Sequence, residues 1–287
     1  MYKVLVVGLK GVDSGKTTFS RALLSHLRDE GLNVCGFKPM AGNNIWYDYD
    51  VVAKALSKGR LYGRDVGLLK EESTGDVPEE LINPVHRLWS EPSQIDPATG
   101  LPTFIIDRIT LWPEGEGDDE PEDGYESGCG GERSVLVESP KVHLNGEMEI
   151  LRKLYQKAAE VFRAEDANDL NRLVEAYYGS AIRSAYRRIA KERDAVVVEG
   201  YSDAALPAPI SGLDLVVGVE PWRISVFDPE RYRNAVKLSA PAYSAEVSTG
   251  RVTELLRPTR VVEYQPSSPH ERVDRLKEMM DQVLEGS

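Results

Sequence analysis

This sequence has no long apolar run, fewer basic than acidic residues, and few cysteines and histidines. No segment approaches the run of about 20 apolar residues that a membrane-spanning helix needs, so the sequence predicts no membrane association. Lys and Arg number 35 against 47 Asp and Glu, and the formal net charge of -12 argues against nucleic-acid binding through a basic surface. The 2 cysteines and 4 histidines lack the spacing of metal ligands. These absences exclude a zinc site, a membrane protein and a general nucleic-acid binder.

The features of a secreted protein are absent as well. The first residues, Met1 to Val4, lead directly into an apolar run, without the charged, apolar and small-residue zones of a signal peptide. Disulfides are rare in the cytoplasm, so we expect Cys35 and Cys129 to be free thiols rather than a pair. The sequence therefore predicts a cytoplasmic location.

What the sequence does contain is an alternation of strand-type and helix-type patterns. With 287 residues, the chain is long enough for one large α/β domain or two smaller ones. Apolar runs alternate with long helical patterns, which is typical of a mostly parallel sheet covered by helices. We therefore predict a three-layer α/β fold in a single domain over residues 1–287. Strands are expected at Tyr2–Val7, Asn33–Phe37, Ala195–Val198, Leu213–Val219 and Arg260–Tyr264, and helices at Thr17–Asp29 and at about 50–58, 147–164, 168–192 and 270–284.

Residues 95–145 interrupt this alternation. Two strand-type segments, TFIIDRITLW at 103–112 and SVLVESPKVHL at 134–144, flank a stretch with eight acidic residues between Glu114 and Glu126. An inserted β-hairpin arm with a mobile acidic tip is the simplest interpretation. The acidic run is either a solvated loop or a site for a metal or a partner, and it lacks the ligand spacing of a calcium loop.

The first turn has the composition of a phosphate-binding loop. The stretch LVVGLKGVDSGKTTF, residues 5–19, joins a buried strand to an amphipathic segment. It departs from the common pattern G-x-x-x-x-G-K-[ST], because Lys10 stands where the first glycine belongs. Phosphate binding needs converging backbone amides, a helix N-terminus and a cation. The candidate residues for these roles are Gly11, Val12, Asp13, Ser14, Gly15, Lys16, Thr17 and Thr18.

Within this loop the side chains have distinct expected roles. Lys16 would reach the β- and γ-phosphates, and the hydroxyl of Thr17 would bind Mg²⁺. Lys10 is either a second phosphate-facing lysine or a solvated residue. Gly-Lys-Thr-Thr directly after a buried strand is not expected at a strand-turn-helix connection that has no binding function. We therefore predict a nucleotide site.

Two polar residues follow predicted strands. Lys38 comes directly after the run that ends at Phe37, and ligands collect at the carboxyl ends of strands in open α/β sheets. It would neutralise a transferring phosphoryl group or a substrate carboxylate, or else it is a structural lysine that reaches solvent. Glu199 ends the run Val196–Val198, which is the placement expected for a Mg²⁺-facing carboxylate. Its alternative is a structural carboxylate in a salt bridge.

Three ordered segments resemble dethiobiotin synthetase and its wider family of P-loop NTPases. GVDSGKTT at 11–18 is similar to the family's loop leading to Gly-Lys-Thr, although two residues shorter. VCGFKPMAGN at 34–43 resembles its strand ending in Gly-Tyr-Lys-Pro-Val, and ELINPVHRLWSEP at 80–92 resembles its Ile-Asn-Pro segment. AVVVEG followed by LDLVVGV is a weaker fourth match. The resemblance covers about half of the chain and implies a P-loop NTPase fold that binds ATP and Mg²⁺.

The family's activity supplies further expectations. Its members transfer the γ-phosphoryl group of ATP to a small carboxylate or carbamate, which implies a catalytic role for Lys16 and Lys38 and a small-molecule substrate, a carboxylate or an amine. An aspartate near residue 50 helps to hold Mg²⁺ in the resembling enzymes, so Asp50 is the candidate metal ligand beside Thr17 and Glu199, with Asp48 next to it. Aspartate is also a preferred helix N-cap, which is the alternative role for Asp50. The resemblance also implies a homodimer.

The resemblance ends after Glu199. The family has a Gly-Ala-Gly-Gly-like turn near its substrate, whereas this chain has Gly200-Tyr201-Ser202-Asp203-Ala204. This difference and the inserted arm favour a second hypothesis, a nucleotide-switched regulatory ATPase or GTPase that acts on a protein partner. The guanine-reading motif Asn-Lys-x-Asp is absent, which favours ATP over GTP.

Overall fold

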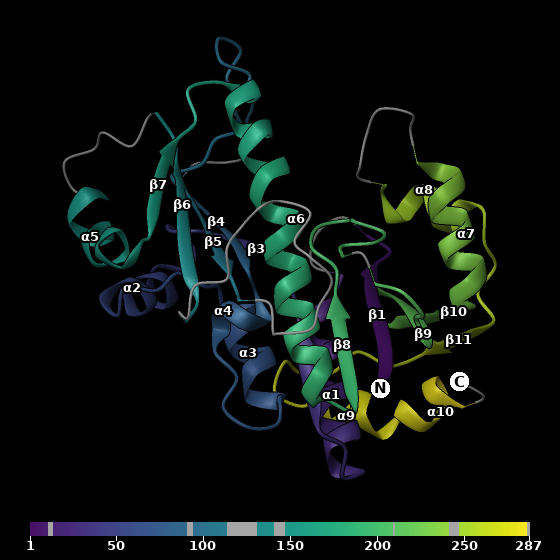
Figure 1. Ribbon diagram of the computed structural model, residues 1–287. Helices are drawn as coiled ribbons and strands as arrows, with labels where there is room; N and C mark the ends of the chain where they lie inside the picture. Colours follow the sequence, from purple (N-terminus) through teal and green to yellow (C-terminus); the bar gives the residue numbers. More distant parts are fainter. Residues whose placement is uncertain are drawn as a thin grey trace. The chain divides into compact units, whose positions relative to one another are not determined.

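The computed structural model describes residues 1–10, 14–90, 94–113, 131–140, 147–208, 210–240 and 247–285, and these form an α/β protein (Figure 1). The chain divides into two compact units rather than the single domain that we predicted. Unit 1 contains Met1–Met40, Asp65–Ile82 and Ile189–Ser287, and unit 2 contains Ala41–Arg64 and Asn83–Arg188. All of the strands predicted outside residues 95–145 belong to unit 1, so the sequence pattern gave no sign of a second sheet built largely from other segments.

Unit 1 is built on a six-stranded sheet with the order β11-β10-β9-β1-β8-β2. Strands β2, β8, β1 and β9 are parallel, and β10 and β11 complete the sheet in antiparallel fashion. The five predicted strands are present within two residues of their expected starts, whereas β10 was missed because Pro221 and the left-handed Trp222 (φ 67) connect it tightly to the preceding strand. The bounds are β1 (Tyr2–Gly8), β2 (Val34–Phe37), β8 (Ala195–Glu199), β9 (Leu215–Glu220), β10 (Arg223–Phe227) and β11 (Arg260–Glu263).

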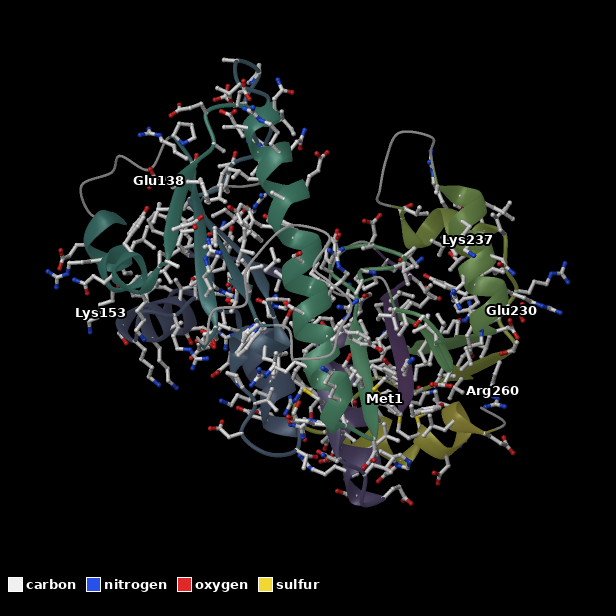
Figure 2. All side chains as sticks on the ribbon, in the orientation of Figure 1. Met1, Glu138, Lys153, Glu230, Lys237 and Arg260 are labelled. Atoms are coloured by element: carbon white, nitrogen blue, oxygen red, sulfur yellow. The ribbon has the colours of Figure 1, made fainter. Side chains whose placement is uncertain are left out.

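Helix α1 (Lys16–Asp29) packs on the parallel strands of unit 1. Its predicted apolar positions, among them Phe19 and Leu23, are buried, and Gly31 (φ 85) follows its end as expected. Charged side chains such as Glu230 and Lys237 are exposed on a second helix of this unit (Figure 2). The other helices assigned to unit 1 are α3 (Arg64–Glu72, from Asp65 onward), α4 (Glu79–Ile82), α7 (Pro229–Ser239), α8 (Thr249–Glu254), α9 (Arg272–Glu278) and α10 (Met280–Leu284).

Unit 2 is built on a five-stranded sheet with the order β3-β4-β5-β6-β7. The pairs β4·β5 and β5·β6 are antiparallel, whereas β6·β7 is parallel. The strands are β3 (Met40–Asn44), β4 (Val85–Trp89), β5 (Ile106–Leu111), β6 (Arg133–Glu138) and β7 (Glu160–Arg163); the helices are α2 (Tyr49–Ser57), α5 (Glu147–Lys157) and α6 (Ala167–Glu192), the last turn of which belongs to unit 1.

The predicted hairpin arm differs from what the structure contains. The two strand-type segments do pair as an antiparallel hairpin, β5 and β6, but β4 and β7 flank them, so they lie inside the sheet of unit 2. Ile106 and Leu136 belong to a buried cluster with residues of α2 and α5, because strands with such apolar faces must be covered. The acidic run and Cys129 lie outside the described residues. No helix in the described parts of the chain is long and apolar enough to cross a bilayer.

Candidate functional site

Three adjacent parallel strands of unit 1 end beside one another and supply the polar residues of the candidate site. Strand β8 pairs with β1 on one side and with β2 on the other. Glu199 is the last residue of β8, Lys38 follows the last residue of β2, and the loop after β1 leads to Lys16 at the start of α1. Because carboxyl ends of parallel strands share one edge, residues far apart in the sequence meet here.

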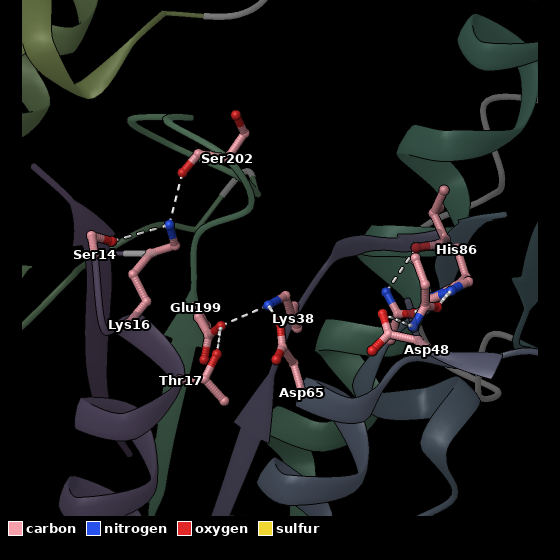
Figure 3. A network of polar contacts seen from close by, with 12 residues as sticks. Ser14, Lys16, Thr17, Lys38, Asp48, Asp65, His86, Glu199 and Ser202 are labelled. Atoms are coloured by element: carbon pink, nitrogen blue, oxygen red, sulfur yellow. Dashed lines mark hydrogen bonds and ion pairs between the residues drawn. The ribbon is translucent and has the colours of Figure 1, made fainter. Parts of the chain in front are cut away.

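A chain of short polar contacts joins Glu199 and Lys38 to Thr17 and Asp65 (Figure 3). The hydroxyl of Thr17 donates to Oε1 of Glu199 at 2.7 Å, and the ammonium of Lys38 donates to the same oxygen at 2.7 Å. Lys38 also pairs with Oδ2 of Asp65, near the start of α3, at 2.5 Å. Thr17, Glu199 and Lys38 were predicted to share a site, and the structure brings them together.

Glu199 is fully buried, with a relative exposure of 0%. Its Oε1 atom accepts both hydrogen bonds, whereas Oε2 has no hydrogen-bond partner among the described residues. A buried carboxylate oxygen without a partner carries a desolvation cost, which a bound cation would offset. Hydroxyl and carboxylate oxygens are ligands that Mg²⁺ accepts, so Thr17 and Glu199 fit a magnesium site.

The pKa values of the two lysines of the site are shifted in opposite directions. Burial lowers the pKa of Lys38, but the adjacent carboxylates of Glu199 and Asp65 outweigh burial and raise the pKa above its ordinary value. The pKa of Lys16 is lowered, first by burial and then by the positive charge of Lys38. Lys38 is therefore a firmly held cation, whereas Lys16 is a cation whose charge would be stabilised by an anionic ligand.

The backbone of the loop has features that a phosphate site requires. Gly15 has φ 91, in the left-handed region, and as the N-cap of α1 it has no side chain to accept from the first amides of the helix. The first turn of α1 also contains no acidic residue. A Cβ at Gly8 would lie 2.6 Å from Oγ of Ser14 and 2.9 Å from Nζ of Lys16, so any larger residue there would displace these two side chains.

Lys16 is hydrogen-bonded on the protein itself. Its ammonium donates to the carbonyl oxygen of Ser202 at 2.8 Å and to Oγ of Ser14 at 3.4 Å (Figure 3). Ser202 lies in the turn after β8, the segment in which the sequence departs from the resembling family. This turn thus contacts the proposed phosphate-binding lysine.

The other residues predicted around the phosphate-binding loop are Thr18, Gly11, Val12, Asp13 and Lys10. Thr18 lies in the first turn of α1, while Gly11, Val12 and Asp13 lie outside the described residues. Lys10 is exposed and lies 3.5 Å from Glu220, which decides neither of its two alternatives.

Asp50 is not among the groups that unit 1 gathers. It belongs to unit 2, where its side chain is 70% exposed and pairs with Arg64 at 3.1 Å. Asp48 occupies the N-cap position of α2 and accepts a hydrogen bond from Asn43. Asp50 lies in the first turn of α2 rather than at its N-cap, and Asp48 makes no side-chain capping hydrogen bond, so neither aspartate is an N-cap of the predicted kind.

Asp65 is the carboxylate that the sequence reasoning missed. It is 49% exposed and pairs with Lys38, which lies 27 positions earlier in the chain. The available signal was an acid at the start of a short amphipathic segment, with Val66 and Leu69 buried. The same pattern is common at ordinary helix starts, so the sequence alone did not distinguish Asp65 from Asp50.

Comparison of the sequence with protein-family models finds no matching family, and comparison with curated proteins finds no match.

Within the described residues, no group of three or more His, Cys, Asp or Glu side chains is arranged to hold a metal by itself. A cation at this site would therefore complete its coordination with oxygens that do not come from such a cluster, as Mg²⁺ does when it bridges protein and phosphate.

Proposed function

We propose that unit 1 binds ATP with Mg²⁺ at the end of β1 and that the protein transfers the γ-phosphoryl group. One observation supports this most strongly: Thr17, Glu199 and Lys38, predicted separately as Mg²⁺- and phosphate-binding residues, lie in one hydrogen-bonded chain with a buried, partly unsatisfied carboxylate. A purely structural glutamate would be expected to have both carboxylate oxygens hydrogen-bonded, whereas Oε2 of Glu199 has no hydrogen-bond partner among the described residues.

Each residue has a role that follows from its surroundings. Lys16 would exchange the carbonyl oxygen of Ser202 for phosphate oxygens, which are stronger acceptors because they are charged. Thr17 and Glu199 would hold Mg²⁺, with Asp65 as the nearby second carboxylate in place of Asp50. Mg²⁺ would supply charge neutralisation at the phosphates when bound.

The proposed reaction needs positioning and charge neutralisation but no protein nucleophile. An oxygen of a small carboxylate or carbamate forms a bond to the γ-phosphorus, the bond from that phosphorus to the bridging oxygen breaks, and ADP leaves. Lys38, held between two carboxylates, stays protonated near the transferring group. This reaction class also accords with the resemblance to dethiobiotin synthetase.

The proposal is tested by calorimetric titration of ATP and GTP in the presence of Mg²⁺. Lys16→Ala should weaken ATP binding at least about tenfold, or 1.4 kcal/mol, because charged hydrogen bonds to phosphate are lost. Lys3→Ala is the matched control, since Lys3 also donates to a backbone carbonyl, that of Ser211, at 2.8 Å and lies on β1. Absence of nucleotide binding to the natural protein would refute the proposal.

A nucleotide-switched ATPase remains the second candidate, and the contact of Lys16 with Ser202 favours it. In that case water replaces the acceptor, and hydrolysis alters a protein surface. Release of ADP that depends on a small carboxylate supports phosphoryl transfer to a metabolite. Slow hydrolysis that changes only with a protein partner supports the switch.

A further inference from the structure

The turn after β8, residues Gly200–Ala205, is held in a strained conformation. Ser202 has φ 45, which lies in the left-handed region that side chains other than glycine seldom adopt. Such a conformation costs about 1 to 3 kcal/mol and persists only where surrounding contacts enforce it. The carbonyl oxygen of this strained residue accepts the hydrogen bond from Lys16.

The same turn is attached on its other side to the start of α8. The carbonyl oxygen of Asp203 accepts two hydrogen bonds from Thr249, from its amide at 2.6 Å and from its hydroxyl at 2.8 Å. The amide of Ala205 donates to the carbonyl of Val247 at 2.8 Å, and Ala204 forms an isolated bridge with Ser248. Thr249 is fully buried, whereas Asp203 is exposed, so the turn is attached to α8 at the edge of the packed interior.

The turn therefore joins two parts of unit 1 through consecutive carbonyl groups. Ser202 offers its carbonyl to the lysine at the start of α1, and Asp203 offers the next carbonyl to the first residue of α8. The two carbonyls belong to adjacent peptide units that meet at the Cα atom of Asp203, so the φ and ψ angles of Asp203 set the direction of one carbonyl relative to the other. Both contacts therefore depend on the backbone conformation of Asp203.

We propose that Gly200–Ala205 is a nucleotide-responsive switch and that Thr249 is the positioning residue that couples it to α8. This inference rests on the proposed function. Phosphate oxygens draw the ammonium of Lys16 away from Ser202, the turn relaxes from its strained conformation, and the bonds between Asp203 and Thr249 weaken. The start of α8 thereby senses whether the nucleotide site is filled.

The experiment compares hydrogen exchange with and without a saturating, non-hydrolysable ATP analogue and Mg²⁺. In the natural protein, the amides of Ala205 and Thr249 should exchange about 2- to 10-fold faster with nucleotide, which corresponds to loss of one hydrogen bond. Thr249→Val removes the hydroxyl donor at nearly constant size, so these amides should already exchange fast without nucleotide and respond little to it. Thr249→Ser keeps the hydroxyl and should restore the response.

The matched control is Thr253→Val. Thr253 lies one helical turn further along α8, and its hydroxyl donates to carbonyls of that helix, those of Thr249 and Gly250, rather than to the turn. It should leave the nucleotide response at Ala205 and Thr249 unchanged. An equal loss of response in Thr253→Val and Thr249→Val would overturn the assignment of Thr249.

Calorimetry on the same samples tests nucleotide binding separately from the proposed switch. Nucleotide binding without any change in exchange at Ala205 and Thr249 overturns the switch and leaves the proposed function intact. Failure of nucleotide to bind overturns both. If a Thr249 variant does not fold, the exchange rates of the natural protein with and without nucleotide still test whether the turn responds to nucleotide.

Discussion

Glu199 and Glu220 occupy the same position on their strands but differ in their surroundings. Each is the last residue of a strand that pairs in parallel with β1, yet Glu199 is fully buried between Thr17 and Lys38, whereas Glu220 forms ion pairs with the exposed side chains of Lys10 and Arg223. Position on the strand therefore does not by itself make a functional carboxylate. The buried lysine partner distinguishes the two.

The first prediction concerns Glu199→Gln. The amide keeps the shape but removes the negative charge, so the ammonium of Lys38 loses its ion pair with Glu199 and keeps the one with Asp65. We expect Mg²⁺-dependent nucleotide turnover to fall at least about 100-fold, the scale on which removal of an electrostatic group at a reaction centre acts. Glu220→Gln should keep turnover within about twofold. Equal rates for the two variants, measured as ADP release, would contradict the assignment.

The second prediction concerns the pH dependence of nucleotide binding through Lys16. Burial and the charge of Lys38 lower the pKa of Lys16, so in the free protein it loses its proton at lower pH than an exposed lysine does. Phosphate binds the protonated form of Lys16. The affinity for nucleotide is therefore highest below this pKa and falls as pH rises through it, by up to about tenfold per pH unit. Lys16→Arg keeps its charge over this range and should bind independently of pH.

That prediction is measured as the dissociation constant of Mg·ATP between about pH 7 and about pH 10 at fixed ionic strength. A decline that is the same in the natural protein and in Lys16→Arg would show that another group titrates, and Lys16 would lose its assigned role. The pKa of Lys38 is shifted in the opposite direction, and this shift bears on folding stability. Because the pKa of Lys38 is raised, its stabilising contribution is complete below the pKa of an unfolded lysine and is lost as pH rises through the folded value.

At the scale of elements, the strand-loop-helix of β1 and α1 depends on close approach at Gly8. A Cβ there would press on the side chains of Ser14 and Lys16 and lie 3.1 Å from the carbonyl of Lys10. The third prediction is that Gly8→Ala displaces the ammonium of Lys16 and weakens nucleotide binding at least about tenfold, or 1.4 kcal/mol. Gly67→Ala is the control, because Gly67 is helical and a Cβ there meets nothing within 4 Å.

The control variant Gly67→Ala should itself change the free energy of unfolding. Alanine at position 67 should stabilise α3 by about 0.5 to 1 kcal/mol through helix propensity, without an effect on nucleotide affinity. Calorimetric affinity and denaturant unfolding of both variants test these outcomes. Equal nucleotide affinity in Gly8→Ala and the natural protein would mean that the loop tolerates a side chain at its first glycine.

The elements around the site were predictable because their patterns are strong and local. The apolar run before Gly8, the helical spacing of Phe19 and Leu23, and the run ending at Glu199 each determine an element without tertiary information. Helix α5 was predicted to extend to residue 164, but it ends at Lys157, and its expected last turn instead forms β7 beside β6. Pairing with a distant strand overrode helical periodicity there.

Contacts across the chain were the part that sequence could not supply. Asp65 and Asp50 both stand near the start of a short helix, and only the fold distinguishes the partner of Lys38 from the partner of Arg64. The contact of Lys16 with Ser202 spans 186 positions and depends on a left-handed serine, for which no sequence pattern exists. Identity of the residues was predictable, whereas their pairing was not.

At the scale of the whole molecule, the second unit has a polar centre of its own. Asp107 on β5 is fully buried and accepts two hydrogen bonds from Arg87 on β4, at 2.7 and 2.6 Å, and one from Tyr178 on α6 at 2.5 Å. We predicted a hairpin arm for this segment, and a fully buried, charged residue is not expected in such an arm. A buried ion pair with all of these partners instead indicates a packed interior that the sheet and α6 of unit 2 form together.

The fourth prediction follows from that ion pair. Asp107→Asn removes the charge that compensates the guanidinium of Arg87, and breaking a buried pair on one side costs about 3 kcal/mol or more. Native-state hydrogen exchange of the amides in β4 and β5 should report this loss as faster exchange throughout the two strands. Asp169→Asn is the control, because Asp169 pairs with the exposed Arg172 one helical turn away, and such surface pairs contribute little. Equal exchange in the two variants would show that the interior of unit 2 does not depend on the pair, and the sheet would then rest on its apolar cluster alone.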